Sequence, residues 1–148
     1  MKTLTLAKHA ALGAALLSTG APLLHAQDVQ IAPGTTASIQ FMNGGVGESE
    51  RASIRKAGAA FKLRVELSER ADNELVADAA LKITDMKGQP VLDLAQAGPI
   101  VNVNVPNGTY RVDASLHGQT ESRVVTLRGR DRANLYFHWV GSPKAATS

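Results

Sequence analysis

A strict alternation of apolar and polar side chains begins at Phe61 and constrains the fold more than any other feature of the chain. In FKLRVELS, polar residues separate four apolar ones, Phe61, Leu63, Val65 and Leu67. Successive side chains of a β-strand point to opposite faces, so this pattern predicts a strand with one buried and one hydrated face. Strands of this kind are typical of antiparallel sheets.

Six more stretches with strand patterns follow between turn signals such as DMKG (85–88), Asn107-Gly108 and Gly118-Gln119. The Asn-Gly pair after Pro106 predicts a tight two-residue reversal. Seven short strands with no crossover helices between them predict an all-β, seven-stranded antiparallel Greek-key sandwich. The stretches cover 80–85, 90–94, 100–105, 110–116, 122–128 and 133–140. We expect a two-sheet core that contains Leu63, Val65, Leu81, Ile83, Val103, Tyr110, Val112, Phe137 and Trp139.

The sequence of residues 27–58 predicts a segment ahead of the sandwich, a lead-in with a glycine-rich loop and one short N-terminal helix. Within it, ASIQFM (37–42) is compatible with a short strand. GESERASIRKAG has its acidic residues first, its basic residues last and Gly58 where the helix should stop. A helix of about ten residues does not persist alone in water. We therefore expect it to cover one end or edge of the sandwich through four apolar residues, Val46, Ala52, Ile54 and Ala57.

The first 26 residues are typical of an export signal. Lys2 and Lys8 precede an apolar centre, and cleavage is expected after Ala26. Removing the two lysines lowers the net charge from +3 to +1, which argues against a nucleic-acid partner. We expect a periplasmic or secreted protein with no membrane span, a domain over 59–140 and a disordered tail over 141–148.

The chain contains no cysteine. It therefore forms no disulfide, has no thiolate nucleophile and cannot attach c-type haem. Three arginines at 128, 130 and 132 remain close together, and we interpret them as a solvated turn offset by Asp131.

The stretch VPNGTYRV (105–112) resembles the carboxypeptidase regulatory-like domains, and the resemblance extends over about residues 60–140. It implies a transthyretin-type (prealbumin-like) sandwich. The chain from 27 onward also resembles small exported proteobacterial proteins of this domain type that have no assigned activity. One enzyme of this fold, 5-hydroxyisourate hydrolase, ends in Tyr-Arg-Gly-Ser, whereas this chain ends in FHWVGSPKAATS. The resemblance thus implies a fold and a compartment but no reaction.

The stretch GGVGESER is the first candidate site. A phosphate-binding P-loop needs Gly-Lys-Ser/Thr at the helix start, but Glu48 follows Gly47 here. The dinucleotide pattern requires a βαβ unit, which the predicted fold lacks. We interpret the glycines as a hinge, Gly47 as the helix cap and Glu50 as reaching back to the loop. A partner-binding loop is the open alternative, with a possible interaction surface of Gly44, Gly45, Gly47, Glu48, Glu50 and Arg51.

The remaining candidates lie on strands. His117 and His138 have no third ligand at a recognisable spacing, so no metal or other cofactor is expected. The absence of Gly-x-Ser-x-Gly leaves no serine favoured as a nucleophile. Asn102 with Asn104, and Lys62 with Arg64 and Glu66, are interpreted as hydrated sheet faces. Tyr136 and His138 should face outward from the last strand, where a sugar or peptide could stack on the tyrosine ring.

These patterns predict a noncatalytic exported module, an accessory or protein-interaction protein of the periplasm. The alternative is a carbohydrate- or peptide-binding domain that uses Tyr136, and an uncharacterised hydrolase is the third hypothesis. The expected partner is accordingly another periplasmic protein or a glycan.

Overall fold

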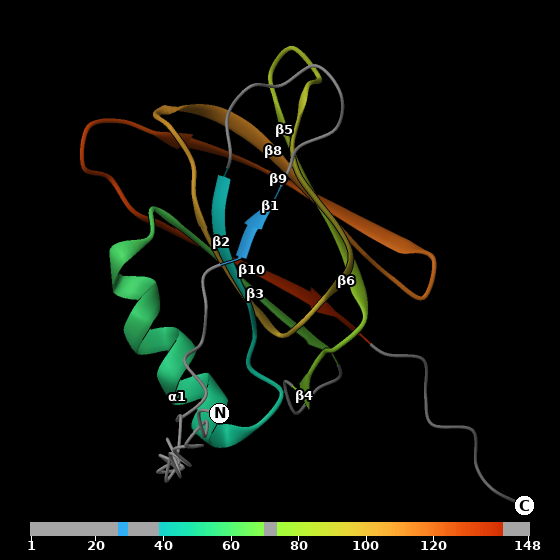
Figure 1. The fold of residues 1–148 in the computed structure, drawn as a ribbon. Coiled ribbons are helices and arrows are strands. Elements are labelled where there is room, and N and C mark those ends of the chain that lie inside the picture. The colour runs from blue at the N-terminus through green and yellow to red at the C-terminus, as the bar shows by residue number, and fades with distance from the viewer. Residues whose placement is uncertain (1–26, 30–38, 70–73, 141–148) are drawn as a thin grey trace, which may run out of the picture.

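Two β-sheets stack face to face in the computed structural model of the chain, which describes residues 27–29, 39–69 and 74–140 (Figure 1). The larger sheet has the order β1-β2-β7-β3-β10, and β4 also pairs with β3. Its strands are β1 (Gln27–Val29), β2 (Ile39–Gly44), β3 (Leu63–Glu69), β4 (Glu74–Leu75), β7 (Ile100–Asn104) and β10 (Ala133–Trp139). The smaller sheet has the order β6-β5-β8-β9, with β5 (Ala79–Asp85), β6 (Pro90–Ala97), β8 (Gly108–Leu116) and β9 (Gln119–Leu127).

Each of the seven stretches predicted as strands contains a strand, and the two-sheet β architecture is confirmed. The described residues contain three strands beyond those seven, β1, β2 and β4. The predicted export signal and the predicted tail at 141–148 lie outside the described residues, as do Ala37 and Ser38 of the possible short strand.

One pairing departs from the antiparallel prediction. β10 runs parallel to β3, with Ala133 opposite Leu63 and Trp139 opposite Glu69. Parallel neighbours need a long connection, and here strands β4 to β9, including the whole smaller sheet, lie between β3 and β10 in the chain. The alternation of apolar and polar residues within a strand does not indicate whether its neighbour runs parallel or antiparallel.

The core lies between the sheets, and all nine predicted core residues are buried. Leu63 and Val65 of β3 face Leu81 and Ile83 of β5 through one continuous apolar cluster. Burial of whole aliphatic side chains contributes about 1.5–3 kcal/mol each, so this layer dominates the stability of the fold.

The Pro106-Asn107-Gly108 segment is not the tight hairpin that the sequence predicted. It carries the chain from β7 in one sheet to β8 in the other. The Tyr110 hydroxyl donates to the Pro106 carbonyl oxygen at 2.7 Å and ties this crossing together. Burial, with a smaller effect of the Asp85 carboxylate, raises the pKa of Tyr110 above its usual value.

Of the two other predicted turns, the one at 85–88 is confirmed, whereas the one predicted at Gly118-Gln119 lies one residue earlier, because Gln119 begins β9 and His117 belongs to the turn and not to a strand. His117 and Gly118 adopt φ angles of 48° and 79° between β8 and β9, the left-handed pair that a two-residue hairpin favours. Between β5 and β6, Asp85 Oδ1 accepts hydrogen bonds from the backbone N–H groups of Lys87 and Gln89.

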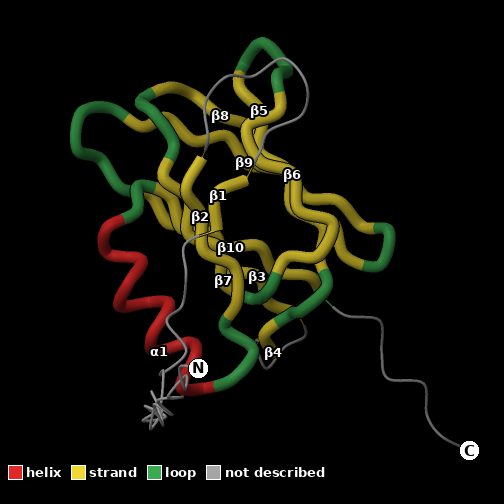
Figure 2. The backbone as a smooth tube through the Cα atoms, in the orientation of Figure 1, coloured by secondary structure: helices red, strands yellow, loops and turns green. Residues whose placement is uncertain are grey.

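Helix α1 (Glu48–Ala57) continues into the 3-10 turn η1 (Gly58–Ala60) and packs on the outer face of the larger sheet (Figure 2). Ile54 is fully buried against Met42 of β2 and Ile100 of β7. The expectation that the helix covers an end or edge was therefore wrong. So was the expectation that four apolar residues anchor it, since Val46, Ala52 and Ala57 are exposed.

Candidate functional site

The predicted interaction residues fall into two groups that lie on different elements. Six of them form the elbow between β2 and α1, and Tyr136 and His138 lie on β10 at the opposite edge of the sheet. The structure therefore does not combine the two groups into one continuous strand surface.

The elbow directs its polar groups onto itself. Glu50 Oε2 accepts a hydrogen bond from the Val46 backbone N–H at 3.2 Å, and Arg51 Nη1 donates to the Val46 carbonyl oxygen at 3.1 Å. Gly45 has a φ of 97°, a left-handed conformation that glycine adopts without strain. This geometry agrees with the hinge-and-cap interpretation of the segment.

The helix start has Gly47 as its N-cap, with no side-chain cap hydrogen bond. Glu48 and Glu50 occupy the first turn of α1, where acidic side chains interact favourably with the helix dipole. Gly44 is half-buried, and a Cβ there would collide with the Glu50 carboxylate.

The Arg64 face of β3 is not the open hydrated surface that the sequence predicted. Asn102 is fully buried beneath α1, its Nδ2 donating to the Ile54 carbonyl oxygen at 2.9 Å. Arg64 Nε donates to Asn102 Oδ1 at 3.0 Å, and Arg64 Nη2 donates to the Arg55 carbonyl oxygen at 2.8 Å. Both side chains thus donate to carbonyl groups of the last helical turn, and the Ile54 carbonyl also accepts from the Gly58 backbone N–H.

Glu66 of the same face is also covered, because Arg55 of α1 pairs with it at 3.1 Å. Asn104 does remain exposed, as predicted. The helix thus converts part of a polar sheet face into a buried interface.

Beyond the helix, the outer face of β10 stays open. We call the outward residues Asn134, Tyr136 and His138 the β10 strip. Tyr136 is 61% exposed, whereas Phe137 and Trp139 on the other face are buried, as predicted. His138 Nδ1 and Ser68 Oγ form a hydrogen bond of 3.1 Å, which fixes the imidazole ring beside β3.

A pocket of about 260 Å³ adjoins the start of this strip. We call it the η1–β10 pocket. Its lining comes from η1, β3, the segment between them and the start of β10 with the residue before it, namely Gly58, Ala59, Phe61, Arg64, Arg132, Ala133 and Asn134. No pattern in the sequence predicts this pocket, because residues more than sixty positions apart line it.

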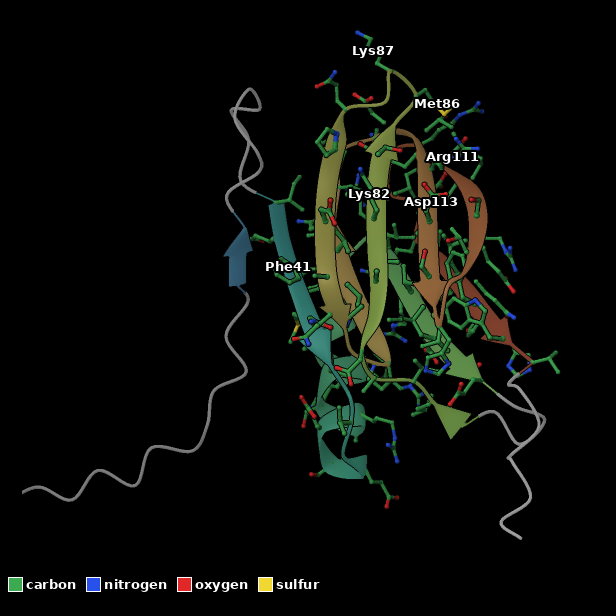
Figure 3. All side chains as sticks on the ribbon, turned by 90° about the vertical axis from the view of Figure 1, so that its right-hand side faces the viewer. Phe41, Lys82, Met86, Lys87, Arg111 and Asp113 are labelled. Atoms are coloured by element: carbon green, nitrogen blue, oxygen red, sulfur yellow. The ribbon has the colours of Figure 1, made fainter. Side chains whose placement is uncertain are left out.

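A second pocket of about 280 Å³ lies on the outer face of the smaller sheet. Figure 3 shows Lys82, Arg111 and Asp113 on the neighbouring strands β5 and β8, with Met86 at the turn beyond them. Met86 and Val124, which line the pocket, are 65% and 62% exposed. The only sequence signal was the Val124-Val125 pair, since adjacent strand residues cannot both face the core.

The two histidines singled out from the sequence lie on different elements but beside adjacent residues of β3, Ser68 and Glu69. His117 is at the β8–β9 turn, with Nδ1 4.0 Å from Glu69 Oε2, and His138 is on β10. Across the described part of the chain, no three His, Cys, Asp or Glu side chains gather where they could hold a metal ion. Nor does any described helix have the length and apolar character needed to cross a membrane.

Comparison with known proteins adds no identification. No protein-family model matches the chain, and a search of curated proteins finds no match. The function is therefore inferred from the chemistry of the residues and from their geometry.

Proposed function

We propose that the chain is a noncatalytic binding module that recognises another protein through the β10 strip. The observation that carries the proposal is Tyr136, a residue that is 61% exposed on a strand whose other aromatic residues are buried. An aromatic ring on a rigid strand loses little conformational entropy on binding, and tyrosine is enriched at the energetic centres of interfaces.

The surroundings of Tyr136 suit an interface. On one side lies the Arg55–Glu66 ion pair, since Glu66 is opposite Tyr136 in the register of β3 and β10. Along β10, the next side chains on the same face are the amide of Asn134 before Tyr136 and the imidazole of His138 after it. A central aromatic residue with a polar rim is the usual arrangement of a protein-binding patch.

The wider context is part of the same proposal. The resemblance of residues 60–140 to carboxypeptidase regulatory-like domains supports a transthyretin-like, seven-stranded Greek-key core, to which β1, β2 and β4 would be additions. The charged start and apolar centre of residues 1–26 support export to the periplasm.

A glycan is the second candidate ligand. A flat, exposed tyrosine ring between an asparagine and a histidine offers one stacking face and two hydrogen-bonding groups, which suits a sugar ring. The same residue therefore anchors both candidates, and the experiment must separate them.

Site-specific photo-crosslinking tests the proposal. A photoreactive phenylalanine analogue at position 136 should crosslink a discrete protein in an extract of the source cell envelope, whereas the analogue at position 124 should not. Tyr136→Ala should then weaken binding of that purified partner by about tenfold or more, as expected for an interface anchor. Val124→Ala is the matched control, because Val124 is 62% exposed on the other sheet.

Two outcomes would contradict the proposal. Equal crosslinking from both positions would show that the β10 strip is not selective. Binding of purified cell-envelope glycans that is lost in Tyr136→Ala, with no protein crosslink, would favour the glycan-binding alternative.

A further inference from the structure

The η1–β10 pocket has a cationic lining. Arg64 and Arg132 both line it, and no acidic side chain does. Phe61, Ala59 and Ala133 supply apolar wall next to these two charges. A pocket of this composition attracts an anionic group that is carried on an apolar stem.

Arg64 is fixed in place before any ligand arrives. Its Nε and Nη2 atoms are bonded to Asn102 Oδ1 and to the Arg55 carbonyl oxygen. No bond within the described part of the chain uses Nη1, which leaves the N–H donors of that atom available to a ligand. A pre-ordered guanidinium binds an anion with a smaller entropy cost than a mobile one.

Gly58 is required for this arrangement. A Cβ on Gly58 would lie 2.5 Å from Asn102 Oδ1 and 2.7 Å from Arg64 Nη2. Only glycine therefore lets η1 approach the arginine closely enough to form one wall of the pocket.

The surrounding surface has the same sign of charge. Arg128 and Arg130 belong to the turn that leads to Arg132, and all three are exposed. Asp131, the one acidic residue in this turn, accepts a hydrogen bond from the Arg128 backbone N–H at 3.2 Å. Several like charges around a pocket raise the local concentration of an oppositely charged ligand.

We propose that the η1–β10 pocket binds the carboxylate of an acidic peptide segment on the partner protein. This inference rests on the proposed function and assigns the chemistry of the partner. The carboxylate bonds Arg64 Nη1 and the Arg132 guanidinium, the Asn134 amide donates a further hydrogen bond, and the methylene stem packs on Phe61. A carboxylate on a hydrocarbon stem suits the apolar wall better than a strongly hydrated phosphate ion does.

The test uses the purified chain and two fluorescein-labelled peptides, one that alternates Glu and Ser and a twin with Gln in place of Glu. Fluorescence anisotropy at low ionic strength should show the Glu peptide binding about tenfold more tightly than the Gln twin, since charge-assisted bonds add to each contact. Added salt should weaken binding of the Glu peptide more than binding of the Gln peptide.

Two arginines of one turn provide matched variants. Arg132→Gln should weaken binding of the Glu peptide about fivefold or more. Arg130→Gln should weaken it less than about twofold, because a pocket contact is stronger than a screened surface charge. Both changes remove one exposed positive charge, but only Arg132 lines the pocket. Asn134→Leu, which leaves the charge unchanged, should also weaken binding.

Three outcomes would overturn the inference. If the Arg130 and Arg132 variants lost equal affinity for the Glu peptide, the attraction would be diffuse and not specific to the pocket. If the Glu and Gln peptides bound equally well, no carboxylate would be recognised. Displacement of the Glu peptide by inorganic phosphate at lower concentration than by glutarate would assign the pocket to phosphate groups. If the crosslinked partner still depends on Tyr136 in any of these cases, only the carboxylate assignment fails.

Discussion

Gly58 shows how a single hydrogen atom in place of a side chain positions a whole element. It is buried where α1 passes into η1, directly over Asn102 and Arg64. Its φ of −62° and ψ of −12° are ordinary helical values. The requirement for glycine at this position is therefore one of space and not of backbone conformation.

At this residue scale, we predict that Gly58→Ser lowers the free energy of unfolding by about 1–3 kcal/mol, the usual cost of overpacking. Urea denaturation monitored by circular dichroism would measure it. Gly47→Ser is the matched control at the other end of the helix, where a Cβ would meet nothing within 4 Å. It should leave stability unchanged or raise it by a few tenths of a kcal/mol through N-capping.

Equal destabilisation by the two serine variants would contradict the packing argument. It would mean that loss of glycine, rather than the crowding over Asn102, determines the effect.

At the scale of the element, α1 is attached to the sheet by one apolar residue and a set of polar bonds. Ile54 is its one buried residue. Asn102 and Arg64 hold the last-turn carbonyl groups, and the Arg55–Glu66 ion pair lies at the rim. Arg55 is about half exposed in that pair, and exposed ion pairs contribute little to stability.

Truncation of Ile54 to alanine should therefore cost about 2–5 kcal/mol, as for other fully buried aliphatic side chains. Because alanine favours the helix, the loss of unfolding free energy would come from weaker docking of α1 and not from a lower helix propensity. Chemical denaturation together with amide hydrogen exchange in α1 would measure both effects. Ser53→Ala, on the exposed side of the helix, should change stability by less than about 0.5 kcal/mol.

A loss for Ile54→Ala no larger than that of Ser53→Ala would show that the polar bonds alone hold the helix. Faster exchange confined to α1, with unchanged global stability, would show that it opens separately from the sandwich.

At the scale of the whole molecule, β9 is an edge strand of the smaller sheet and is nine residues long. Its Glu121 and Arg123 lie opposite the buried Ala114 and Val112 and therefore point inward. The two side chains pair at 2.8 Å, and the Arg123 guanidinium carbon lies 5.1 Å from the centroid of the Phe137 ring. Inward-pointing charges on an edge strand oppose pairing with another chain.

We predict that the double substitution Glu121→Val with Arg123→Val promotes self-association through β9. Valine favours extended structure and removes the charges that would be buried in an intermolecular sheet. Light scattering coupled to size-exclusion chromatography, over a range of concentrations, would detect the larger species. Ser122→Val, on the outward face of the same strand, should associate much less, and equal association would indicate general surface hydrophobicity instead.

Local patterns in the sequence predict seven of the strands and the face on which most of their side chains lie. Alternation in FKLRVELS placed Leu63, Val65 and Leu67 in the core, but it misplaced Phe61, which packs with Ile54 of the helix instead. LYFHW was correctly divided into a buried Phe137 and Trp139 and an exposed Tyr136. The helix also follows from local signals, since Gly47, Glu48 and Glu50 at its start and Gly58 at its end match its bounds. These features are local, because backbone geometry and capping act over a few residues.

The element that covers each outward face depends on long-range packing. Asn102 has the same alternation as the exposed Asn104, but α1 covers only the first of them, so Asn102 is buried. The parallel β3–β10 pair, the sheet-to-sheet crossing at 106–108 and the η1–β10 pocket likewise join residues distant in sequence. A two-residue period fixes the face of a side chain but not the strand or helix that lies against it, because that depends on long-range packing of the whole chain.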